Sequence, residues 1–164
     1  METAGFVVIA FIYATVGVFA VIGSAVLTQR LLPVRWEQAF YALFLIAIAA
    51  FYLAFVAYFR ASGAWITESV AVLIFGAIAV AGIRSVPLLV LGYLLHGAWD
   101  FLHELQAHAG GPLAGDGFTG IPLAYGIFCA TFDVGIAVYA LRRRAVWAGA
   151  VSSSADADPF PATR

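Results

Sequence analysis

Ionisable side chains gather in one short stretch of an otherwise apolar chain. The segment GYLLHGAWDFLHE, residues 92–104, contains His96, Asp100 and His103. At about 100° per residue, an α-helix places these three side chains within about 60° of one another, on one face. Trp99 and Glu104 flank this face on its two sides. Imidazole and carboxylate groups in this arrangement can bind a metal ion or transfer protons, so the segment is the first candidate for a functional site.

Two acidic residues from other segments are expected to join this face. From the helical rise of about 1.5 Å per residue, Asp133 lies at roughly the depth of His96. Glu68 lies at roughly the depth of His103 and the neighbouring glutamate. The sequence therefore predicts an inner pair and an outer group around one cavity, which Tyr13 and Tyr52 also line. The inner pair is His96 with Asp133, and the outer group consists of Glu68, Asp100, His103 and Glu104.

Three chemistries are open to these residues. Acid–base catalysis needs a proton donor and an acceptor, for which Asp100 and Asp133 are the candidates, with Trp99 stabilising a cation. A metal site needs converging nitrogen and oxygen ligands, and zinc, iron and manganese are all compatible with them. A proton or ion path would use the same groups. The metal ligands would be His96, Asp100, His103 and Glu104, and the catalytic set Asp100, Asp133, His96, Trp99 and Glu68.

Structural explanations exist for several of these residues. A buried histidine bonded to an aspartate on another helix can simply hold the two helices together. Glu68 can complement the N-terminus of its own helix if Thr67 is the cap. His108 and Asp116 are expected in a solvated region, and Cys129 is expected to be a packing residue. Five ionisable groups at membrane depth nevertheless exceed what helix pairing requires, which favours a function.

The composition identifies the class of protein that must position these residues. The chain has 164 residues, of which 64% are hydrophobic and 10% are charged. It contains no lysine and no asparagine, which excludes a retinal or pyridoxal Schiff base, a phosphate-binding P-loop and N-glycosylation. The single cysteine excludes an internal disulfide and a thiolate iron–sulfur cluster. The net charge of −1 offers no basic face for nucleic acid.

The apolar runs predict an all-α bundle of five membrane-spanning helices in a single domain over 1–144. A helix needs about 20 apolar residues to cross a bilayer, and the candidate spans are 4–27, 39–59, 65–83, 86–109 and 121–141. In this arrangement Arg30, Arg35, Arg84 and 142–144 fall on one side and Arg60 on the other. The positive-inside rule then places the N-terminus outside and the C-terminus in the cytoplasm. Residues 145–164 are expected to form a disordered cytoplasmic tail.

A four-span alternative merges the third and fourth segments. It would bury Arg84 and Pro87 in hydrocarbon, so the five-span arrangement is preferred. An odd number of spans also argues against a transporter built from a simple inverted repeat.

The polar segment carries a resemblance to a known group of proteins. GYLLHGAWDFLHE followed by FCATFDVGIAVY resembles small, uncharacterised bacterial integral membrane proteins that pair a His-x2-Trp-Asp-x2-His helix with a Phe-Asp helix. The resemblance covers about the C-terminal third of the chain and implies a multi-pass protein of the bacterial plasma membrane. A looser architectural analogy exists with sterol-isomerase and terpene-cyclase membrane bundles, whose intramembrane acids and aromatic residues handle carbocations.

These observations together predict a membrane-embedded enzyme that acts on an apolar lipid or isoprenoid by acid–base chemistry, with or without a divalent metal. The isomerase, cyclase and hydrolase types all fit. After Asp133, the fifth span reads VGIAVYAL, with one polar residue. The inner half of the bundle is therefore expected to be sealed, and the cavity to be blind-ended. The expected partners are membrane lipids, a hydrophobic small-molecule ligand and a second copy of the chain. The alternatives are a non-enzymatic small-molecule or ion-binding protein and a structural assembly protein.

Overall fold

The computed structural model describes residues 3–109 and 117–155, and it consists of helices joined by short connections. The all-α prediction is therefore confirmed. Five long helices follow one another along the chain, with one turn of 3-10 helix between the second and the third. Their bounds are α1 Thr3–Leu31, α2 Val34–Phe59, η1 Ser62–Ala64, α3 Trp65–Gly82, α4 Val86–Ala109 and α5 Tyr125–Ala155.

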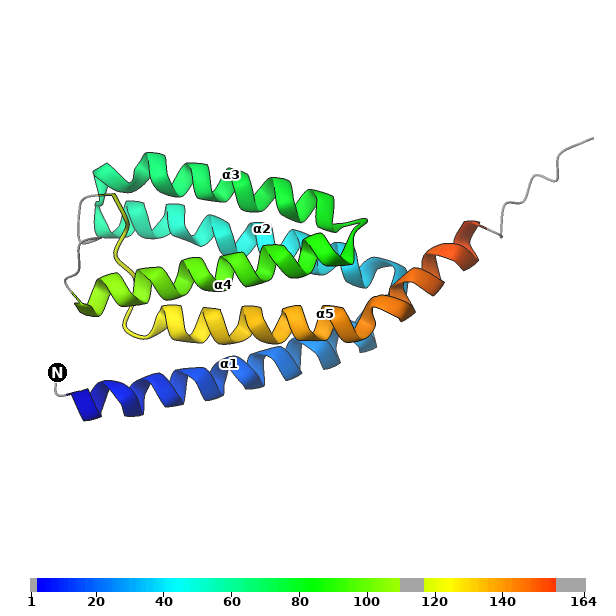
Figure 1. Cartoon of the computed structure of the whole chain (residues 1–164), viewed down its shortest axis with the longest axis horizontal. Coiled ribbons are helices and arrows are strands. Elements are labelled where there is room, and N and C mark those ends of the chain that lie inside the picture. The colour runs from blue at the N-terminus through cyan, green and yellow to red at the C-terminus, as the bar shows by residue number, and fades with distance from the viewer. Residues whose placement is uncertain (1–2, 110–116, 156–164) are drawn as a thin grey trace, which may run out of the picture.

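The five helices run up and down in alternation, side by side (Figure 1). Pro33 ends the first connection, since a proline at this position cannot continue the preceding helix. Arg60 ends α2 in the left-handed conformation, with φ 55°, and its backbone N–H caps the helix by donating to Val56. The N-terminus of α1 thus lies at the same end of the bundle as the α2–α3 connection, whereas the C-terminal part of α5 projects from the opposite end (Figure 1).

Four of the helices are long and apolar enough to cross a membrane. Those stretches are Gly5–Leu31, Val34–Phe59, Ser62–Gly82 and Tyr125–Ala150. Helix α4 has sufficient length but carries the two histidines and two acidic residues of the 92–104 segment. The helix that departs from an apolar composition is therefore the one that the sequence identified as the candidate site.

The helices pack unequally. Helix α4 makes its most extensive contacts with α5, α2 packs on α3, and the apolar α1 touches mainly α5 at the edge of the bundle (Figure 1). Glycines allow the close approach of α4 and α5. A Cβ atom added at Gly126 would lie 2.4 Å from the Asp100 carbonyl oxygen. A Cβ atom added at Gly97 would lie 3.2 Å from Asp133 Cβ. The main core cluster includes Tyr41, Leu45, Leu89, Tyr93, Ile136 and Trp147.

Several predicted boundaries shift in the structure. The third and fourth spans, predicted at 65–83 and 86–109, agree closely with α3 and α4, while α1 and α2 extend beyond 4–27 and 39–59 toward Pro33. The fifth helix begins at Tyr125 instead of residue 121. A turn precedes it, in which the Tyr125 backbone N–H donates to the Pro122 carbonyl oxygen. The prediction of a disordered tail is wrong for 145–155, because α5 continues to Ala155 and the Trp147 side chain is buried. Residues 156–164 lie outside the described residues.

Candidate functional site

The centre of the site is a histidine held between two aspartates in the middle of the bundle. Nδ1 of His96 lies 2.6 Å from Oδ2 of Asp133 on α5 and 3.1 Å from Oδ2 of Asp100, one turn along α4. All three side chains are at most 1% exposed. The predicted inner pair of His96 with Asp133 is therefore confirmed. We call the three residues His96, Asp100 and Asp133 the central triad.

A tyrosine from α2 completes the surroundings of the triad. The Tyr52 hydroxyl donates a hydrogen bond of 2.5 Å to Oδ1 of Asp100, and Tyr52 is itself buried. The Phe75 ring on α3 packs edge-to-face with the His96 imidazole, with the ring centroids 4.9 Å apart. Helices α2, α3, α4 and α5 therefore all contribute to the environment of the triad, and its carboxylates are fixed by several elements at once.

A second imidazole–carboxylate pair lies toward the end of the bundle that holds the N-terminus. Nε2 of His103 is 2.8 Å from Oε1 of Glu68, and both residues are buried. The same Glu68 oxygen accepts the backbone N–H of Thr119 at 3.1 Å, and its other oxygen accepts the Trp99 indole N–H at 3.3 Å. The rings of Trp99 and His103 also contact Phe118 of the loop before α5. We call Glu68 and His103 the second pair.

Hydrogen-bond geometry favours one arrangement of protons in the second pair. Nδ1 of His103 lies 3.0 Å from the Trp99 carbonyl oxygen, which can only accept, so Nδ1 carries a hydrogen. Because Glu68 already accepts two N–H groups, the favourable arrangement is an ionised carboxylate facing a doubly protonated imidazole. The second pair is then electrically neutral as a unit.

The predicted outer group is only partly brought together. Glu68 and His103 meet, but Asp100 joins the central triad because its position one turn after His96 aims it at Tyr52 and the imidazole. Glu104 also departs from the group: its carboxylate accepts the backbone N–H of Gly126 at 3.0 Å.

The structure brings together only two residues of the predicted metal set. Of its four residues, His96 and Asp100 converge, with Asp133 as the third member, and their ligand atoms lie within 4.8 Å of one another. His103 belongs to the second pair instead.

The structure also changes the interpretation of individual residues. Glu68 lies in the first turn of α3, but the N-cap residue is Ala64 and the carboxylate is bonded to other helices and loops, which argues against a role confined to its own helix. Tyr52 contacts the triad as expected, whereas Tyr13 is 39% exposed on α1 at the edge of the bundle. Cys129 is buried, as expected of a packing residue. Asp116 and the His108 side chain lie outside the described residues.

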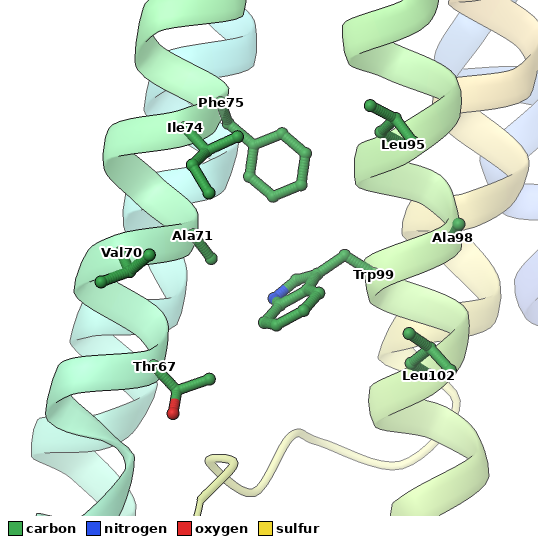
Figure 2. A pocket seen from close by; sticks show the side chains of 9 residues that line it. All are labelled: Thr67, Val70, Ala71, Ile74, Phe75, Leu95, Ala98, Trp99 and Leu102. Atoms are coloured by element: carbon green, nitrogen blue, oxygen red, sulfur yellow. The ribbon is translucent and has the colours of Figure 1, made fainter.

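An apolar groove runs between α3 and α4 beside both groups. It has a volume of about 510 Å³, and the Trp99 indole reaches across it from α4 toward α3 (Figure 2). The expected blind-ended polar cavity is not what the described residues form, because the polar side chains contact one another directly and this groove is almost wholly apolar. Its lining consists of Thr67, Val70, Ala71, Ile74, Phe75, Leu95, Ala98, Trp99 and Leu102.

Two groove residues separate it from the buried polar groups. Trp99 donates its indole N–H to Glu68, and Phe75 contacts the His96 ring. Several other lining side chains, including Val70, Ile74 and Leu95, are 45–53% exposed on the outer surface of the bundle. The groove thus opens sideways, and a single layer of aromatic side chains divides it from both polar groups.

Sequence reasoning missed a third polar group at the opposite end of the bundle. The buried Glu37 carboxylate on α2 accepts hydrogen bonds from Arg143 Nη2 at 2.6 Å and from Trp147 Nε1 at 2.8 Å, and the Tyr139 hydroxyl donates to its other oxygen. We call these four residues the Glu37 cluster. The three donors recur every four residues along α5, which places them on one helical face, and this spacing was the available signal.

The comparisons with known proteins identify a family. Residues 9–146 match the family of unknown function DUF6010, so the chain belongs to this family. Neither the curated proteins nor the solved structures gave a match.

Proposed function

We propose that this protein is a membrane-embedded enzyme that acts on an apolar lipid or isoprenoid by acid–base chemistry. The observation that carries the proposal is the placement of two imidazole–carboxylate groups directly behind an apolar groove that opens on the side of the bundle. Buried ionisable groups in apolar helices are costly, and a function is the usual reason for their presence. The groove volume lies within the range of about 300 to 1,000 Å³ that small-molecule sites occupy.

The substrate would lie in the groove with its apolar chain along α3 and α4. The Trp99 ring, which is partly exposed to the groove, would stabilise positive charge that develops on the substrate. Behind it, the second pair would supply the acid and the base: the proton between His103 Nε2 and Glu68 would pass to a reacting carbon and return from it. Because Trp99 both lines the groove and donates to Glu68, movement of this side chain would change the access of a substrate to the carboxylate. Asp100 and Asp133 remain candidates for a donor and an acceptor deeper in the bundle.

The same proposal includes a location in the membrane. Five spans with the N-terminus outside place Arg30, Arg35, Arg84 and Arg143 on the cytoplasmic side of a bacterial plasma membrane. The second pair then lies in the outer half of the membrane and the Glu37 cluster at the cytoplasmic end. A lipophilic substrate would reach the groove sideways from the lipid.

The test is isotope exchange into lipid. Purified protein is reconstituted in nanodiscs made from a bacterial total lipid extract and incubated in D2O, and the lipids are analysed by high-resolution mass spectrometry. Because protonation of a double bond and its reversal exchange solvent hydrogen with carbon, one lipid class should gain deuterium or change its structure. Glu68→Gln should lower the rate at least about 100-fold, the contribution expected of a positioned acid–base group.

A matched variant separates this role from a general effect on the bundle. Arg142→Gln changes an exposed charge on α5 and should leave the rate unchanged. If no lipid changes in the wild-type sample, the enzyme proposal fails, and the non-enzymatic binding or assembly functions take its place.

A further inference from the structure

The buried carboxylates differ in whether a positive charge accompanies them. Glu37 faces the Arg143 guanidinium, and Glu68 faces the His103 imidazole, so each of these carboxylates has one basic partner to itself. The central triad contains two carboxylates and one imidazole. With both carboxylates ionised, the triad retains one net negative charge even when the imidazole is doubly protonated. Among the described residues, His96 is the only base within ion-pair distance of either aspartate.

An uncompensated charge of this kind is expensive in the middle of an apolar bundle. The effective penalty for taking one ion out of water into a protein interior is several kcal/mol. Two of the four carboxylate oxygens also lack a hydrogen-bond donor: within the described part of the chain, Asp133 Oδ1 and Asp100 Oδ2 form no hydrogen bond, although Asp100 Oδ2 lies 3.1 Å from the imidazole nitrogen. Both side chains are fully buried. The triad therefore has spare acceptor capacity as well as excess negative charge.

We propose that His96, Asp100 and Asp133 bind one divalent transition-metal ion. Neutral imidazole, two ionised carboxylates and one divalent cation sum to zero charge, which removes the imbalance. One nitrogen and two oxygens are the donor set that zinc, manganese and iron(II) accept, and three protein ligands leave a further position for a water or substrate oxygen.

The geometry is close to what such an ion requires. The converging atoms are Nδ1 of His96 and one Oδ2 atom from each aspartate, at 2.6 and 3.1 Å from the nitrogen. With bonds of about 2.0 to 2.2 Å, ligand atoms around one ion separate by a little over 3 Å. The three atoms here lie within 4.8 Å of one another, so side-chain rotations would have to open the short contacts with the imidazole slightly to admit an ion. The Tyr52 hydroxyl, bonded to Oδ1 of Asp100, orients that carboxylate and leaves Oδ2 free to coordinate. Tyr52 is thus a positioning residue of the proposed site.

Metal content of purified protein tests the proposal. Elemental analysis of wild-type protein, expressed with zinc, manganese and iron in the medium, should give about one ion per chain, the stoichiometry of a single site. Asp133→Asn and His96→Gln should each lower this to about a tenth or less, because they remove one of only three ligands. His103→Gln is the matched control: it alters the other imidazole–carboxylate pair on the same helix and should retain the metal.

A second measurement keeps the test valid if a variant fails to fold. Wild-type protein stripped with a chelator should show a higher unfolding temperature when zinc or manganese chloride is added, since an ion that binds only the folded state stabilises it. Metal-free wild-type protein with no such rise, or metal retained by Asp133→Asn, would overturn the assignment. This result is independent of turnover: a metal-free protein that still exchanges deuterium into lipid would refute the metal site and leave the proposed function standing.

Discussion

The Glu37 carboxylate and the carboxylates of the central triad are all buried, yet their surroundings are built in opposite ways. Around Glu37, one carboxylate receives N–H and O–H donors from three side chains, and one of them is a guanidinium. In the triad, two carboxylates compete for a single imidazole nitrogen. The Glu37 carboxylate has a cationic partner and several hydrogen-bond donors. The two aspartates of the triad have one imidazole between them, and two of their oxygens accept no hydrogen bond.

This difference separates a group that holds the fold from a group suited to chemistry. A satisfied cluster stabilises the chain and offers nothing to a ligand, because its acceptors are occupied. An unsatisfied buried group costs stability and is retained where a ligand, metal or substrate completes it. Replacing a carboxylate by its amide should therefore destabilise the protein at the Glu37 cluster but have little effect, or a stabilising one, at the central triad.

The largest effect is expected for Glu37→Gln. The amide keeps the shape of the side chain but removes the charge that faces Arg143, and breaking a buried pair on one side costs roughly 3 kcal/mol of folding free energy. Unfolding of purified protein in detergent, followed by circular dichroism against denaturant, gives the value. The exposed neighbour Arg35→Gln is the control and should stay within about 0.5 kcal/mol of wild type. A Glu37→Gln protein as stable as wild type would remove the structural half of the comparison.

Gly126→Ala should destabilise the bundle by about 2 kcal/mol, because overpacking at a close contact forces the backbone to move. The added Cβ would meet the Asp100 carbonyl oxygen and the Glu104 side chain, so α4 and α5 must separate beside the triad. The same unfolding experiment measures this. Gly149→Ala is the matched control, since its Cβ would have open space and alanine favours a helix by up to about 1 kcal/mol. Equal stability of both variants would contradict the tight α4–α5 contact.

Trp147→Phe should cost about 1 kcal/mol, the usual net value of one hydrogen bond, because phenylalanine cannot donate to Glu37. Trp36→Phe, at a tryptophan that is 57% exposed, should change the unfolding free energy much less. This prediction also tests whether residues after 144 belong to the fold. If the two variants are indistinguishable, Trp147 contributes nothing beyond its apolar surface.

The fold followed from the sequence because long apolar helices have a strong local signal. Long apolar runs and the breaks at Pro33 and before Val86 are properties of neighbouring residues, and they identify the helices without tertiary information. The end of α5 was missed for the converse reason. Residues 145–155 are mostly small residues that follow three arginines and include three serines, so they form no long apolar run. The Trp147 indole in this segment donates to Glu37 on α2, 110 positions away in the chain, and no local pattern reveals that contact.

The site was predictable in its members but not in its grouping. Helical spacing placed His96, Asp100 and His103 on one face, and matched depths paired His96 with Asp133. Whether Asp100 turns toward His96 or toward the second pair depends on Tyr52, a residue on another helix whose partner no spacing rule reveals. The groove depends on which side chains α3 and α4 present to each other, and this is likewise a tertiary property.

The most direct test of the contrast is the unfolding free energy of Asp133→Asn in the presence of a chelator. Asparagine preserves the hydrogen bond to His96 and removes one of the two competing charges. The unfolding free energy of the variant should therefore be at most about 1 kcal/mol lower than that of wild-type protein with the chelator, or should be higher. Under the same conditions Glu37→Gln should lose several times as much. A loss for Asp133→Asn as large as that for Glu37→Gln would mean that the triad holds the helices together as the Glu37 cluster does, and would contradict its assignment as a functional centre.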